Sequence, residues 1–94
     1  MKAIWNDEII AESKDTVEVE GNHYFPMESL KKEYIKESKT TSICPWKGTA
    51  SYFSLQVKDK RNEDAAWFYS SPAAAAVEVL NRVAFWKGVS IVDS

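Results

Sequence analysis

Cysteine and histidine are almost absent from this 94-residue sequence, which has one of each, Cys44 and His23. A single cysteine excludes an internal disulfide framework. One cysteine and one histidine also fall short of the four Cys/His ligands of a usual structural zinc site. Glycine is scarce too, and its three copies, at positions 21, 48 and 88, are too widely spread for a phosphate-binding loop. We therefore expect neither a metal site nor a cofactor.

Long apolar runs are also missing. No stretch approaches the roughly 20 apolar residues of a membrane-spanning helix. The residues that follow Met1 lack the apolar core of a signal peptide. A free thiol such as that of Cys44 survives in the reducing cytosol. These features predict a cytoplasmic protein with no membrane partner.

Neither sign of charge is in clear excess. Twelve Lys and Arg residues oppose 14 Asp and Glu residues, which gives a net charge of −2. Nucleic-acid binding requires a basic face that neutralises phosphates. The densest basic group, Lys58, Lys60 and Arg61, is interrupted by Asp59 and is typical of a solvated turn. The sequence therefore predicts no nucleic-acid partner.

Aromatic residues are abundant, with four Trp, four Tyr and four Phe. A domain of this length buries only roughly 60–65% of the surface that its unfolded chain exposes. Trp and Tyr combine a large apolar ring with a polar end, which suits the walls of a pocket. We expect most of these rings in the core and two or three tryptophans around a concave site.

Alternation of apolar and polar residues predicts a single domain, residues 1–94, made mostly of short strands. The eight expected strands cover residues 3–5, 8–12, 16–20, 23–25, 49–57, 64–69, 83–86 and 89–92. Turn-forming pairs at 6–7, 21–22 and 87–88 and a polar turn at 58–63 connect neighbouring strands into antiparallel hairpins.

Two prolines in positions suited to a first helical turn predict two short helices, Pro26–Lys32 and Pro72–Leu80. Both would be too short to be stable alone and would brace the sheets. The fold class is therefore mainly β, or α+β with very little α, built from small twisted antiparallel sheets.

The segment CPWKG, residues 44–48, combines unusual chemistry just before the best predicted strand. Cys44 is either an inert core residue or a reactive thiol. Lys47 is either structural or in contact with a ligand across an aromatic face. His23 is either a hydrogen-bonded residue or a general base. No nucleophile elbow or other catalytic motif accompanies them.

Several blocks together resemble a known family, namely AIWNDEIIAES at 3–13, VEVEGNHYFP at 17–26, CPWKG within 41–57, AAWFY within 64–72 and VAFWKGVSI at 83–91. The chain resembles the bacterial and fungal family called domain of unknown function 427. The resemblance implies a β-tent-like fold, as in methionine sulfoxide reductase B and the thalidomide-binding domain of cereblon. That family sometimes carries a nucleotidyltransferase-like label, which no acidic metal-binding pair or nucleotide loop in this sequence supports.

Three hypotheses for function follow. The favoured one is a binding module for a small molecule or a short peptide. Its site would contain the residues Cys44, Trp46, Lys47, Tyr52, Trp67 and Tyr69, with His23 at the rim. The second is an enzyme that acts through Cys44 or Lys47, or that has a nucleotidyltransferase-like activity. The third is a structural or interaction protein that uses an exposed sheet edge. The sequence leaves open whether the protein is a monomer or a homodimer.

Overall fold

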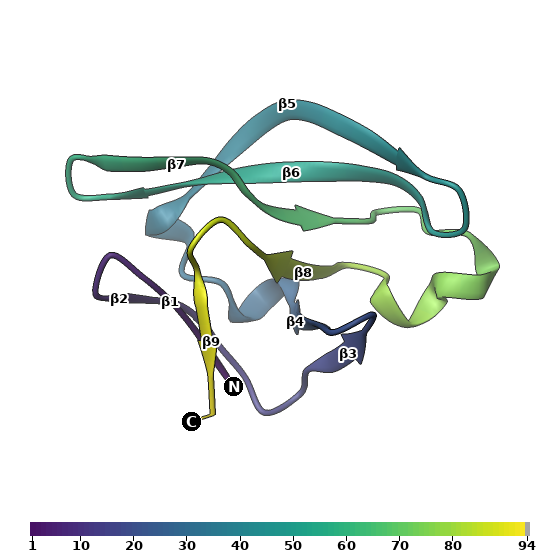
Figure 1. The fold of residues 1–94 in the computed structure, drawn as a ribbon, viewed down its shortest axis with the longest axis horizontal. Helices are drawn as coiled ribbons and strands as arrows, with labels where there is room; N and C mark the ends of the chain where they lie inside the picture. The colour runs from purple at the N-terminus through teal and green to yellow at the C-terminus, as the bar shows by residue number, and fades with distance from the viewer. Residues whose placement is uncertain (94) are drawn as a thin grey trace.

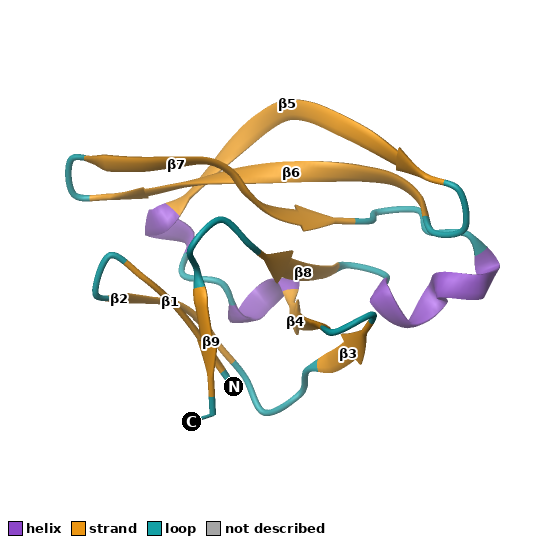
Figure 2. Cartoon of the chain, in the orientation of Figure 1, coloured by secondary structure: helices purple, strands orange, loops and turns teal. Residues whose placement is uncertain are grey.

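Residues 1–93, which the computed structural model describes, form nine β-strands and three short 3-10 helices arranged as two antiparallel sheets (Figures 1 and 2). The smaller sheet has the order β2 (Glu8–Glu12), β1 (Lys2–Trp5), β9 (Ser90–Val92). The larger sheet has the order β3 (Val17–Val19), β4 (Asn22–Pro26), β8 (Arg82–Phe85), β7 (Lys60–Phe68), β6 (Gly48–Val57), β5 (Ile35–Cys44). The predicted mainly β fold with small antiparallel sheets is confirmed.

Two predicted hairpins form, because their turn residues adopt positive φ angles, but the second turns one residue earlier than the predicted pair 21–22. Strands β1 and β2 meet at Asn6 and Asp7, with φ angles of 51° and 64°. Strands β3 and β4 meet at Glu20 and Gly21, with φ angles of 54° and 79°. Two consecutive residues with positive φ match the right-handed twist of the flanking strands.

The long hairpin of β6 and β7 also forms, but its turn is shorter than the predicted polar segment 58–63. The chain reverses after Val57, which pairs with Lys60. The polar residues after Lys60 therefore belong to β7 and pair with β6 outside the core, instead of forming a loop. A bulge follows, since Asp64 has a φ angle of 54° and the register shifts between Phe53 and Leu55.

The predicted hairpin between the last two strands is wrong. Lys87 and Gly88 do make a turn, with φ angles of 54° and 86°. However, β8 already pairs with β4 on one side and β7 on the other. Because both of its edges are occupied, β9 crosses to the smaller sheet and pairs with β1.

The two predicted short helices form only as 3-10 turns. The segment 26–32 contains only the 3-10 turn η1 (Met27–Ser29), and η2 (Lys32–Tyr34) follows it. Leu30 between them is extended and bridges to Ala11, so sheet pairing wins over helix formation there. The second helix is the 3-10 segment η3 (Ala74–Val79), which Ala76 interrupts with a φ angle of −125°. None of these helical turns within residues 1–93 has the length or apolar composition of a membrane-spanning helix.

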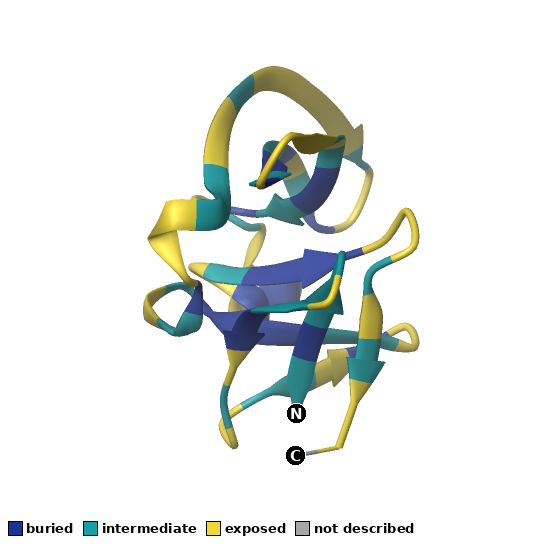
Figure 3. Cartoon of the chain, turned by 90° about the vertical axis from the view of Figure 1, so that its left-hand side faces the viewer, coloured by how far each residue is buried: buried dark blue, intermediate teal, exposed yellow. Residues whose placement is uncertain are grey.

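Two apolar clusters hold the sheets together. The larger joins the two sheets and has Phe25, Leu55 and Phe85 among its buried members. The smaller contains Tyr24 and Tyr69, and η3 contributes to it. Figure 3 shows the buried residues on the central strands and the exposed ones on the outer strands and turns. The CPWKG segment and the predicted site lie beside the smaller cluster.

Candidate functional site

The CPWKG segment forms a tight corner between two strands. Strand β5 ends at Cys44 and β6 begins at Gly48, and these two residues pair with each other across a turn of three residues. Gly48 has a φ angle of 110°, which favours glycine. The carbonyl oxygen of Lys47 accepts a hydrogen bond of 2.8 Å from the backbone N–H of Ala73. The corner is therefore fixed against the segment that leads into η3.

A recess of about 230 Å³ opens beside this corner. The residues that line it are Lys47, Tyr52, Trp67, Tyr69 and Trp86. Tyr52 on β6 lies directly opposite Trp67 on β7 in the ladder. Trp86 follows β8, and its ring meets that of Trp67 edge to face with centroids 6.1 Å apart. Three neighbouring strands thus carry a row of aromatic rings to one place.

Hydrogen bonds within the protein hold these rings. The indole N–H of Trp67 donates to the hydroxyl of Tyr24 at 3.2 Å, and the indole N–H of Trp86 donates to the carbonyl oxygen of Asp64 at 2.6 Å. The hydroxyl of Tyr52 lies 2.8 Å from Oγ of Ser42. The indole N–H groups are engaged inside the protein, so these walls offer a ligand mainly ring surface.

Lys47 is the charged group of the recess. Its side chain is only 8% exposed and forms an ion pair with Glu20, whose side chain is 54% exposed. The ammonium nitrogen lies 5.1 Å from the ring centroid of Trp46 and 5.9 Å from that of Tyr69. Burial lowers the pKa of Lys47, but the hydrogen bond with Glu20 and the nearby tyrosines Tyr24 and Tyr69 outweigh it and raise the pKa overall. The ammonium is therefore protonated at neutral pH.

Tyr69 supplies a neutral hydroxyl next to this cation. Burial raises the pKa of Tyr69 to about 12, although the charge of Lys47 acts in the opposite direction. At neutral pH the recess therefore combines an ammonium group with a phenol that keeps its proton.

The remaining predicted site residues lie outside the lining of the recess. Cys44 is half-buried and packs against the smaller cluster. Trp46 is 39% exposed and covers the ammonium of Lys47. His23 lies on β4 next to buried Tyr24, so its side chain points to the opposite face of the strand. Four of the seven predicted residues, Lys47, Tyr52, Trp67 and Tyr69, thus meet at one recess.

Sequence reasoning did not place two residues of this region. Trp86 is one of the twelve aromatic residues, but it was not among the predicted site residues. Glu20 gave no signal at all, since it lies on a turn far along the chain from Lys47. Only the pairing of β3, β4 and the rest of the larger sheet brings that turn to the CPWKG corner.

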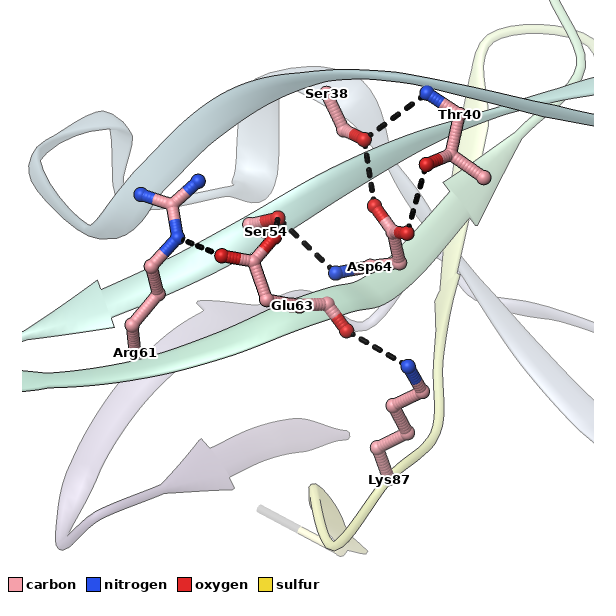
Figure 4. Close-up of polar contacts among 7 residues, drawn as sticks. All are labelled: Ser38, Thr40, Ser54, Arg61, Glu63, Asp64 and Lys87. Carbon is pink, nitrogen blue, oxygen red and sulfur yellow. Dashed lines mark hydrogen bonds and ion pairs between the residues drawn. The ribbon is translucent and has the colours of Figure 1, made fainter.

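A separate polar network surrounds Asp64 at the bulge of β7 (Figure 4). Its carboxylate accepts hydrogen bonds from Ser38 at 2.5 Å and Thr40 at 2.8 Å, both on β5. These hydroxyl groups lower the pKa of Asp64. Its backbone N–H donates to Oγ of buried Ser54 at 3.0 Å, and Lys87 donates to the carbonyl oxygen of Glu63 at 2.9 Å. The network locks three strands together where the ladder is irregular.

No group of three or more His, Cys, Asp or Glu side chains suited to a metal ion occurs among residues 1–93. A comparison with curated proteins finds no match to the chain. The model of the family described as domain of unknown function (DUF427) matches residues 1–94, which include the CPWKG and AAWFY blocks that carried the predicted resemblance. The chain therefore belongs to the DUF427 family.

Proposed function

We propose that this domain binds a small molecule in the recess beside the CPWKG corner. The observation that carries the proposal is the meeting of a buried, protonated lysine with four aromatic side chains at one open recess. Ligand pockets commonly combine apolar and aromatic walls with a few convergent polar groups. Here Lys47 and Tyr69 supply those polar groups, and the rings of Tyr52, Trp67 and Trp86 supply the walls.

The size of the recess favours a small ligand over a peptide. Its volume of about 230 Å³ is below the range of about 300–1,000 Å³ that is usual for drug-sized ligands. A single flat ring with one hydrogen-bond acceptor would contact the aromatic walls and the donors of Lys47 together. A peptide would place one side chain there and leave the rest of its length on the outer surface.

Lysine-dependent catalysis has less support than binding. A nucleophilic lysine needs a lowered pKa so that its amine is neutral near pH 7. The ion pair with Glu20 raises the pKa of Lys47 instead. Cys44 packs against the smaller cluster and does not line the recess.

The four indole N–H signals in a two-dimensional NMR spectrum provide the test. We expect small aromatic fragments to shift the signals of Trp67 and Trp86 in a saturable way. The signal of Trp5, which packs against the other cluster, should stay in place. Trp67→Phe should weaken the binding, whereas the matched control Trp5→Phe should not. A fragment library that gives no saturable shift at Trp67 or Trp86 would contradict the proposal.

A second candidate function is pairing through the edge of β5. This strand is the last of the larger sheet, and its final residues, 41–44, carry no charge. Ile43 within them is 82% exposed. Natural edge strands usually carry charges or bulges that prevent such pairing, and β5 has both before residue 41, so only its end is open to pairing. If β5 joins a second copy, sedimentation should detect a dimer that Ile43→Lys disrupts, and a monomer at high concentration would rule it out.

A further inference from the structure

The ion pair at the recess joins two very unequal partners. The side chain of Lys47 is 8% exposed and lines the recess, whereas that of Glu20 is 54% exposed and does not. Glu20 reaches the ammonium from the β3–β4 turn. The next residue, Gly21, has open space around the position of a side chain. The carboxylate is therefore already in contact with water, while the ammonium is not.

The ammonium of Lys47 needs an anion in every state of the protein. A buried cation without a counter-charge is strongly unfavourable. The faces of Trp46 and Tyr69 stabilise it in part, since a cation over an aromatic ring gains only about 0.5–2 kcal/mol. If Glu20 leaves, another negative charge must take its place.

We propose that the ligand of this recess is a small aromatic monocarboxylate whose carboxylate replaces Glu20 at Lys47. This inference rests on the proposed binding function and adds the charge of the ligand to it. Glu20 is then an internal competitor that neutralises Lys47 in the free protein. In the complex the ligand carboxylate neutralises Lys47, and Glu20 is hydrated on its turn.

The exchange keeps the charge inside the recess balanced in both states. The aromatic ring of the ligand lies against Tyr52, Trp67 and Trp86 while its carboxylate reaches Lys47. The protonated hydroxyl of Tyr69 is a second donor close to that carboxylate. A neutral amide of the same shape cannot replace Glu20, because it would leave the ammonium without a counter-charge.

The test compares benzoate with benzamide, which have nearly the same shape but differ in charge, in NMR titrations of the whole domain. In the wild-type protein we expect benzoate to bind more tightly than benzamide. Glu20→Gln removes the competitor and should tighten benzoate about tenfold to a hundredfold, the effect of one charge-assisted hydrogen bond. It should leave benzamide unchanged. Lys47→Met should abolish the preference for benzoate.

Glu18→Gln is the matched control, because it removes the same charge from the exposed face of β3. Glu20→Asp is a second variant that keeps the charge but draws the carboxylate back, and it should also tighten benzoate. The inference is overturned if benzoate shows no preference over benzamide, or if Glu18→Gln and Glu20→Gln tighten benzoate equally. Saturable binding of benzamide without that preference would overturn the charge exchange and still support the proposed function.

Discussion

The unequal burial of Lys47 and Glu20 predicts that removing either partner has a very different effect on stability. The two perturbations are Glu20→Ala, which leaves the buried ammonium alone, and Lys47→Met, which leaves an exposed carboxylate alone. Methionine has about the same length as lysine and fills the same space without a charge. The pair of variants therefore separates the cost of a buried charge from the loss of the ion pair itself.

The magnitudes follow from the exposed fractions of 8% for Lys47 and 54% for Glu20. In Lys47→Met the carboxylate of Glu20 is rehydrated, so the loss is close to that of a surface ion pair, about 0–1 kcal/mol. In Glu20→Ala the ammonium stays buried without its partner, which costs about 2–3 kcal/mol. For a domain of this size that cost lowers the melting temperature by about 8–24 °C.

The dependence on pH gives the second half of this prediction. In the wild-type protein the pKa of Lys47 is raised, so its contribution to stability is full below about pH 10.4 and is lost as the pH rises through the folded value. In Glu20→Ala burial remains without the hydrogen bond, so we expect the pKa of Lys47 to fall below its ordinary value. The stability of that variant should then rise with pH as the lysine loses its proton.

Urea unfolding of the wild-type protein and both variants between pH 7 and pH 11 is the assay. The expected order of stability at pH 7 is wild type, then Lys47→Met close behind, then Glu20→Ala well below. The reasoning is refuted if Lys47→Met is the less stable variant. It is refuted as well if the difference in free energy of unfolding between the wild-type protein and Glu20→Ala stays constant up to pH 11.

Three further predictions test other parts of the structure. Gly48→Ala should lower the free energy of unfolding by about 1–3 kcal/mol in calorimetry, because a φ angle of 110° is strained for alanine; a smaller loss would mean that the corner can relax. Near-UV absorbance should show one tyrosine titrating close to pH 12, and Tyr69→Phe should remove it and weaken the loss of stability above pH 10. The lowered pKa of Asp64 predicts stability that is full above about pH 4 and is lost as the pH falls further. Asparagine tolerates the positive φ angle at this position, so Asp64→Asn should lose less stability than the wild-type protein as the pH falls in urea unfolding. An unchanged dependence of the free energy of unfolding on pH would contradict the role of the Ser38 and Thr40 hydroxyls.

Local signals were enough to predict the hairpins that close on a pair of turn residues. Asn6 and Asp7 are residue types that tolerate positive φ angles, so the first turn and its strands are visible in a short window. In the second hairpin Gly21 marked the turn, but the turn begins one residue earlier than predicted, because Glu20 and not Asn22 takes the other positive φ angle. The long strands β6 and β7 were visible for a similar reason. Their sequences alternate over several residues, although the bulge near Asp64 leaves neighbouring residues on both faces buried, such as Ser54 with Leu55 and Ala65 with Ala66.

Strand β5 was missed because nothing in its sequence alternates. Most of its residues, from Lys36 to Ile43, are exposed on both faces, so no apolar face marks it as a strand. It forms because β6 offers an unpaired edge. The partner of β9 was likewise invisible, since it depends on which edges of β8 were already occupied.

The site was partly predictable for the same physical reasons. Lys47 and Tyr52 lie close in the sequence, and Trp67 and Tyr69 lie on the strand predicted to pair with that of Tyr52, so their proximity follows from one hairpin. The contribution of Glu20 could not be predicted, because it depends on the position of a distant turn in the finished sheet.

The pairing of β1 with β9 has a consequence for the order of folding. Lys2 lies opposite Val92, so this contact must wait until nearly the whole intervening chain has become compact. Loop closure over such a distance is entropically unfavourable until other contacts have shortened it. Strand β9 should thus join the small sheet late on the folding pathway, and the amide hydrogens that pair β9 with β1 should exchange with solvent sooner than those of β6 and β7.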